Sequence, residues 1–191
     1  GVELELATDW QLLSSTYNTL GDLQLSHGDL HSSIASFEKA LEATERHVER
    51  LPGLQTMTLT NLGIAYARSQ QYEKARHHLL LALEHSEASH TYYKYGDICM
   101  ALGYIEFHRK ALDKAHQFTT RAWHFYTAIE NEDMQIQSMI NLGTIEGGRN
   151  QFKAAEQQLL AAAKKANTAE LTSHEAHAYE ELAEVYLACK P

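Results

Sequence analysis

The feature that most constrains the fold is a short motif that returns at intervals of about 40 residues, a period typical of repeat proteins. Four Leu-Gly pairs occur, and the intervals between their glycines are nearly constant. A fifth string lies one further interval along the chain and has alanine instead of glycine. The five strings are Thr19-Leu20-Gly21, Asn61-Leu62-Gly63, Ala101-Leu102-Gly103, Asn141-Leu142-Gly143 and Glu181-Leu182-Ala183. Such regularity predicts that each repeat is one supersecondary unit.

Apolar and small residues flank each glycine at constant offsets. Nine residues after it comes Leu30, Tyr72, Leu112 or Phe152, and twelve residues after it comes Ser33, Ala75, Ala115 or Ala155. Sixteen residues after it comes Phe37, Leu79, Thr119 or Leu159, and nineteen residues after it comes Ala40, Ala82, Ala122 or Ala162. Thr119 is the unusual member, and neighbouring Phe118 could serve in its place. Four residues before the motif glycine or alanine come Tyr17, Leu59, Cys99, Met139 and Tyr179. These offsets place each set on one face of a helix, so each repeat is predicted to be a helical hairpin that needs a neighbour to bury its apolar faces.

Capping and turn residues divide the chain into nine predicted helices. Asp29 is a plausible N-cap, Thr172-Ser173-His174-Glu175 has the spacing of a capping box, and Gly147-Gly148 ends a first helix. The alternative for residues 1–7 is the end of an earlier second helix. The predicted helices cover 4–26, 29–49, 54–68, 71–87, 90–108, 111–130, 133–147, 151–167 and 172–189.

The segment Asn61–Tyr66, followed by Tyr72–Ala75, resembles the tetratricopeptide repeat. The usual period of that family is about 34 residues, and the longer repeats here, of about 40–42 residues, resemble those of kinesin light chains, maltose-type bacterial activators and peptide-sensing regulators. The family tyrosine three residues after the glycine survives as Tyr66 and Tyr186 and is replaced by Gln24, Glu106 and Glu146. The resemblance implies an all-α superhelix (a solenoid of antiparallel hairpins). We expect a single array over 1–191, with repeats at about 8–50, 51–88, 89–130 and 131–168 and a partial repeat at 171–189, within a longer protein.

The resemblance also implies a concave groove lined by the first helix of each repeat. Carried over position by position, it predicts these groove residues: Asn18, Asp22, Met57, Asn61, Ile64, Arg68, Asp97, Met100, Tyr104, Phe107, His108, Gln137, Ile140, Asn141 and Thr144. The alternative is that the apolar members are buried between repeats. The asparagines have two readings, because an amide can pair with a ligand's peptide group or serve the hairpin itself. The Lys and Arg residues of a carboxylate clamp are missing from the relevant offsets.

Charge and cysteine content exclude several functions. The formal net charge is −9, and no Lys or Arg precedes Lys39. Because nucleic-acid binding draws on Lys and Arg contacts with phosphate, we expect no nucleic-acid partner, and an anionic membrane is disfavoured for the same reason. The two cysteines, Cys99 and Cys189, form no disulfide or metal pattern, which predicts a cytoplasmic location.

Catalytic and metal motifs are missing from the sequence. The twelve histidines include no HExxH motif, and neither a phosphate-binding glycine loop nor a nucleophile elbow occurs. We therefore expect a protein- or peptide-binding scaffold with no enzyme activity, cofactor or metal. The alternatives are a sensor domain of a larger bacterial transcription or signalling regulator and, less favoured, an enzyme such as a phosphatase-assisting protein that acts through an inserted side chain. Homodimerisation is a further possibility if Leu171, Tyr179, Leu182 and Tyr186 expose an apolar face.

Overall fold

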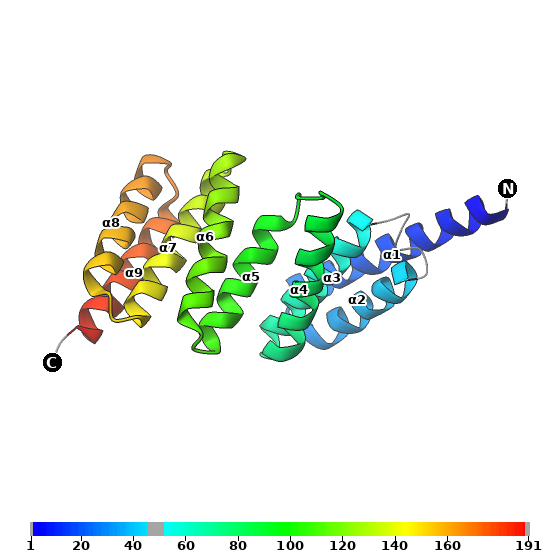
Figure 1. Ribbon diagram of the computed structural model, residues 1–191, viewed down its shortest axis with the longest axis horizontal. Coiled ribbons are helices and arrows are strands. Elements are labelled where there is room, and N and C mark those ends of the chain that lie inside the picture. Colours follow the sequence, from blue (N-terminus) through cyan, green and yellow to red (C-terminus); the bar gives the residue numbers. More distant parts are fainter. Residues whose placement is uncertain (1, 46–51, 190–191) are drawn as a thin grey trace. The chain divides into compact units, whose positions relative to one another are not determined.

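The computed structural model describes residues 2–45 and 52–189, with side chains for 9–45 and 53–189 (Figure 1). Within these ranges the chain forms nine α-helices and no strand, which confirms the all-α prediction. The helices are α1 (Val2–Ser26), α2 (Leu30–Glu45), α3 (Pro52–Arg68), α4 (Tyr72–Ala88), α5 (Tyr95–His108), α6 (Leu112–Ala128), α7 (Glu132–Gly148), α8 (Phe152–Thr168) and α9 (Thr172–Ala188).

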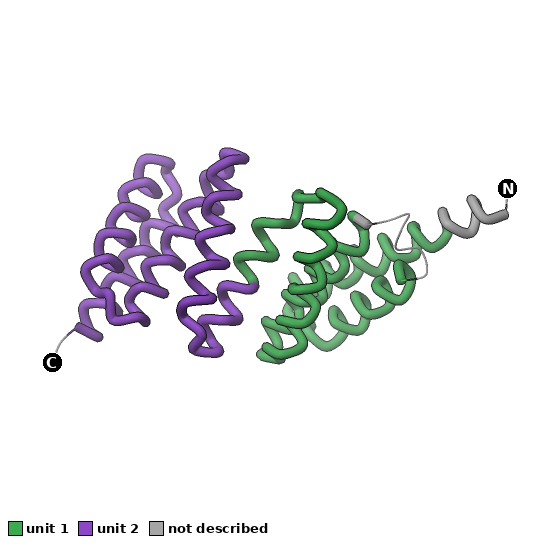
Figure 2. The backbone as a smooth tube through the Cα atoms, viewed as in Figure 1, with its two compact units in different colours: residues 1–101 green, residues 102–191 purple. Residues whose placement is uncertain are grey.

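The chain divides into two compact units (Figure 2). Unit 1, residues 1–101, holds α1 to α4 and the start of α5, with α1 packed on α2 and α3 on α4. Unit 2, residues 102–191, holds the rest of α5 and the consecutively packed helices α6 to α9. The grouping of all repeats into a single array stays a prediction.

Close approach of the two helices in each hairpin explains the recurring glycines. A Cβ atom built on any of the four would lie 2.4–2.5 Å from the side chain sixteen residues later, a distance that real Cβ atoms do not tolerate. The four pairs are Gly21 with Phe37, Gly63 with Leu79, Gly103 with Thr119, and Gly143 with Leu159. Thr119 is therefore the true core residue of its repeat, whereas Phe118 is only half-buried, so the suggestion that Phe118 replaces it is wrong.

The family tyrosine position makes a polar link to the preceding hairpin at Tyr66 and also at Glu146, where tyrosine is replaced. In unit 1, the Tyr66 hydroxyl donates to Glu38 Oε1 at 2.6 Å. In unit 2, Glu146 occupies the equivalent position, and its Oε1 lies 2.8 Å from Nε2 of His116. The carboxylate has thus moved from the second helix of one repeat to the first helix of the next, and the link is retained.

Left-handed residues follow six of the helices at regular intervals along the chain. Their φ angles lie between 53° and 62°, and none of them is glycine: Gln70, His90, Lys110, Glu130, Asn150 and Glu170. Gly28, with φ of 81°, has the same role after α1. After each of these residues the next backbone N–H closes the turn, as where Gln71 N donates to Tyr66 O. This is the Schellman arrangement, which satisfies carbonyl groups at a helix end.

Several predicted boundaries need correction. Helix α5 begins at Tyr95 rather than at residue 90, because His90 is left-handed and Thr91 O accepts a hydrogen bond from Ser86 Oγ. The capping-box prediction at residues 172–175 is wrong, since the N-cap of α9 is Leu171 and has no side-chain bond. The Asp29 cap is confirmed by a bond from Ser32 N to its Oδ1.

The predictions for the two ends of the first repeat have different outcomes. Residues 2–7 continue α1, so they do not end an earlier helix. The predicted extension of the second helix to residue 49 falls partly on residues 46–49, which lie outside the described ranges.

Candidate functional site

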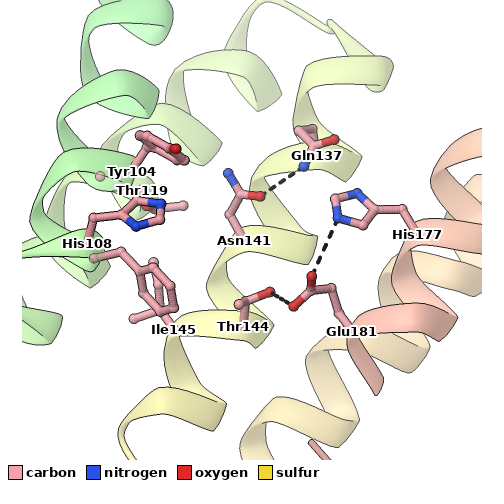
Figure 3. Close-up of a pocket in the computed structure, with 11 residues that line it drawn as sticks. Tyr104, His108, Thr119, Gln137, Asn141, Thr144, Ile145, His177 and Glu181 are labelled. Carbon is pink, nitrogen blue, oxygen red and sulfur yellow. Dashed lines mark hydrogen bonds and ion pairs between the residues drawn. The ribbon is translucent and has the colours of Figure 1, made fainter. Parts of the chain in front are cut away.

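A cavity of about 370 Å³ lies in unit 2, where side chains of α5, α7 and α9 converge (Figure 3). These three helices are the first helices of successive repeats, as the groove prediction requires. The cavity includes six of the predicted residues: Tyr104, Phe107, His108, Gln137, Asn141 and Thr144. Its other lining residues are Gly103, Thr119, Ile145, His177 and Glu181.

One wall of the cavity is aromatic and comes from α5. Tyr104 and His108 are one helical turn apart, with ring centroids 4.3 Å from each other. Phe107 meets the His108 ring edge-on at 5.8 Å. Tyr104 is 47% exposed although it is a large aromatic residue, so this wall offers apolar surface that a bound molecule could cover.

The middle of the cavity is a polar row along α7. Gln137 Nε2 donates to Asn141 Oδ1 at 2.8 Å, which fixes the orientation of the Asn141 amide. Its nitrogen consequently points away from Gln137, on the side of the cavity where Tyr104 lies (Figure 3). No described residue accepts a hydrogen bond from this nitrogen. The Asn141 amide is therefore an available donor that the protein itself holds in position.

The opposite wall carries a carboxylate from α9. Glu181 Oε2 accepts a hydrogen bond from Thr144 Oγ1 at 2.7 Å. Its other oxygen, Oε1, lies 3.7 Å from His177 Nε2, which is an ion-pair distance rather than a hydrogen bond. The carboxylate is thus anchored to α7 by one oxygen and has capacity left on the other.

Ile140 was predicted to line the groove, and the structure corrects this. Its side chain is fully buried in a core cluster that includes Leu159, Leu182 and Val185. Ile140 directly precedes Asn141 on α7, and consecutive residues of a helix point in different directions. The side chain of Ile140 therefore faces the core, whereas that of Asn141 faces the cavity. The alternative of burial between repeats therefore holds for Ile140, whereas Tyr104 is exposed.

Two predicted asparagines in unit 1 are occupied by the protein's own contacts. Asn18 is only 2% exposed, and its Nδ2 donates to Thr58 Oγ1 at 2.7 Å and to Ser14 O at 3.0 Å. Asn61 is 8% exposed and donates from Nδ2 to Asp22 Oδ1 at 3.2 Å. Both amides connect α1 with α3, so their role is structural in this structure.

The other predicted residues of unit 1 are less completely buried. Met57, Ile64 and Met100 are half-buried, as is Asp97, whose Oδ2 lies 3.1 Å from Lys94 Nζ. Arg68 is exposed. Desolvation raises the pKa of Asp22, and the nearby positive charge of Lys94 partly opposes this shift.

Glu181 is the functional candidate that the sequence prediction missed. It stands two residues before the motif position, which is the offset of Asn61 and Asn141. That shared offset was the available signal. It was overlooked because only the amide residues at this position were considered as ligand-binding groups.

The apolar face predicted on α9 is smaller than expected. Leu182 is buried and Leu171 packs against the core cluster, while Tyr179 and Tyr186 are exposed. The Tyr186 hydroxyl donates to Glu156 of α8. Homodimerisation through this helix stays a prediction.

The described part of the chain has neither a cluster of metal-ligating side chains nor a helix that could cross a membrane. Within it, no three His, Cys, Asp or Glu side chains gather closely enough to hold a metal ion. Among the same residues, no helix has both the length and the apolar content needed to cross a membrane.

Comparisons with known proteins identify the repeat. The sequence profile of the tetratricopeptide repeat matches residues 10–47, which cover most of the first hairpin. A search of curated protein sequences finds no match. The resemblance drawn from the Leu-Gly motifs is therefore confirmed by the profile and by the solved structures that follow.

Three solved structures have the same fold. BtubC (BKLC) from P. vanneervenii has a TM-score of 0.79 at 19% identity, over 97% of this chain and 75% of that one. A kinesin light chain with nearly identical TPR-like repeats from Podosopora anserina has a TM-score of 0.76 at 12% identity, over 91% of this chain and 85% of that one. YrrB, described as a TPR protein with an unusual peptide-binding site, has a TM-score of 0.58 at 17% identity, over 91% of this chain and 84% of that one. These likenesses show the fold, which is an all-α fold of helical hairpins of the tetratricopeptide-repeat type.

Proposed function

We propose that this tetratricopeptide-repeat chain is a binding scaffold that holds a peptide, or an extended segment of a partner protein, in the unit 2 cavity. The observation that carries the proposal is the Asn141 amide, whose donor groups have no partner among the described residues. An extended peptide presents a backbone carbonyl at every residue, so it can accept these hydrogen bonds.

The surroundings of Asn141 suit a peptide better than a small polar metabolite. The aromatic wall of Tyr104, Phe107 and His108 offers surface for an apolar side chain. The cavity volume of about 370 Å³ falls within the range of ligand sites. The description of YrrB as a peptide-binding TPR protein supports this use of the fold.

Catalysis is not part of the proposal. The hydroxyl group of Thr144 in the cavity is hydrogen-bonded to the carboxylate of Glu181. In hydrolases that use a nucleophilic hydroxyl, the hydroxyl contacts an imidazole, which the carboxylate then orients. Here His177 stands on the far side of Glu181, so that order is not reproduced.

The proposal is tested by selecting short random peptides on phage with the whole chain and measuring affinity by fluorescence anisotropy. Asn141→Ala is expected to weaken a selected peptide about fivefold, the equivalent of a hydrogen bond worth about 1 kcal/mol. Gln157→Ala is the matched control, because this exposed residue on α8 lies outside the cavity. Equal affinities for Asn141→Ala and the wild type, or failure to select any peptide, would contradict the proposal.

A further inference from the structure

We infer that the unit 2 cavity selects peptides with a lysine or arginine side chain, which would lie between Glu181 and Glu184 above the backbone of Gly147 and Gly148. This inference rests on the proposed function and adds the chemistry of the ligand. It is carried by a second cavity, by the charges that line it and by the acidic partners of Arg149, which follows the two glycines in sequence.

Space for such a side chain exists beside the main cavity. A second cavity of about 230 Å³ shares Thr144 and Glu181 with the first, so the two adjoin. It is also lined by Gly147, Gly148 and Glu184. The two glycines contribute backbone atoms to this lining beside Val185, whose Cγ2 would lie 3.0 Å from a Cβ on Gly147. A long side chain of a ligand could therefore lie along this backbone.

The charge of the second cavity is negative. Glu181 has one oxygen that makes no hydrogen bond to described residues, and Glu184 is exposed with no partner among them. The cavity also adjoins the C-terminal end of α7, where the helix dipole adds partial negative charge. Among the residues that the structure describes, no Lys or Arg lines either cavity.

Arg149, which follows directly after Gly148, pairs with carboxylates other than Glu181 and Glu184. One of its terminal nitrogens lies 3.0 Å from Asp113 Oδ1 and the other 3.6 Å from Glu146 Oε1. It is therefore committed to acidic partners on α6 and α7. Charge complementarity then favours a cationic ligand, while an acidic peptide would meet two like charges.

Peptide selection with charge-neutral variants tests the inference. The double variant Glu181→Gln/Glu184→Gln removes both negative charges, and glutamine at 181 can still accept the Thr144 hydrogen bond. The control Glu170→Gln/Glu180→Gln makes the same change in net charge at exposed residues outside both cavities. Thermal melting by circular dichroism of both doubles checks that they fold.

The wild type and the control are expected to enrich Lys and Arg in the selected peptides. The Glu181→Gln/Glu184→Gln variant should lose this enrichment. It should also bind a basic peptide that was selected with the wild-type protein at least about tenfold more weakly. The inference is overturned if the wild type selects peptides without such enrichment, or if the enrichment survives in that variant. In both cases a loss of affinity in Asn141→Ala would still support the proposed function, whereas failure to select any peptide would remove both.

Discussion

Asn61 in unit 1 and Asn141 in unit 2 occupy the same register position, two residues before the motif glycine, yet their amides differ in availability. Asn61 is nearly buried and donates to Asp22 of the preceding repeat. Asn141 is half-buried, accepts from Gln137 and keeps its own donors available. The residue equivalent to Asp22 in unit 2 is Tyr104, which cannot accept in the manner of a carboxylate. A register position therefore determines the helix face, while the neighbouring repeat determines whether the polar group there is available to a ligand.

The largest expected change in stability distinguishes a core residue of α7 from a cavity residue of α5 in unit 2. Ile140→Ala should lower the free energy of unfolding by about 2–5 kcal/mol, because it leaves a cavity among fully buried side chains. Tyr104→Ser should lower it by less than about 1 kcal/mol, because the ring is largely exposed. Urea denaturation measures both values. Similar losses for the two variants would show that Tyr104 also belongs to the core.

A smaller effect is expected from the glycines of α7. Gly143→Ala should cost about 1–3 kcal/mol, because the new Cβ would lie 2.5 Å from Leu159 Cγ. Gly148→Ala is the control, since its Cβ would lie at an ordinary 3.4 Å from Phe107, and it should leave stability nearly unchanged. Denaturation of both variants makes the measurement. A tolerated Gly143→Ala would mean that the two helices can separate without cost.

The pairing of Asn61 with Asp22 can be measured directly by a double-mutant cycle. Alanine substitutions at these two positions should give a coupling energy of about 0.5–1.5 kcal/mol, the usual contribution of a hydrogen bond. The same cycle at Tyr104 and Asn141 should give a coupling near zero. Equal couplings in the two units would remove the distinction between an occupied and an available amide.

The smallest effect expected is a pH dependence that originates in unit 1. His78 stacks on Tyr66, with centroids 5.5 Å apart, and its buried Nδ1 has no described hydrogen-bond partner. Burial, with a further contribution from His77, lowers the pKa of His78, while Glu38 opposes the shift. By contrast, His116 in unit 2 has the Glu146 carboxylate beside it.

The sign of this dependence follows from the direction of the shift. Because the unfolded chain binds the His78 proton more readily, the stability contribution is complete above the ordinary histidine pKa of about 6.5 and is lost as pH falls below it. The melting temperature of the wild type should therefore fall more between about pH 7.5 and pH 5.5 than that of His78→Phe. The control is His124→Gln, at an exposed histidine of unit 2 that does not contribute to the pKa of His78. Parallel curves for the wild type and His78→Phe would refute the assignment.

The sequence predicted the hairpins well because their packing is local. Only glycine allows close contact with a residue sixteen positions later, so Gly63 and Gly143 carry a strong signal. The groove was harder to predict, since Ile140 and Asn141 are adjacent in sequence and differ in whether they face the core or the cavity. That difference depends on helix rotation within the tertiary packing, which an offset from one glycine does not specify.

The helix ends were predicted only approximately. The left-handed positions after the helices carry side chains, as at Lys110, so the usual glycine signal is missing there. The late start of α5 was missed for a related reason, because residues 90–94 contain neither proline nor glycine. Their turn is stabilised by hydrogen bonds such as that from Ser86 Oγ to Thr91 O.

The regular spacing of the left-handed helix ends has a consequence for how such a chain can change in length. Lys110 and Asn150 have nearly equal φ angles and follow equivalent helices of consecutive repeats. Deleting residues 111–150 would therefore join Lys110 to Gln151 through a turn of the same backbone geometry, without shortening any remaining helix. Gain or loss of one complete helical pair is then conformationally inexpensive.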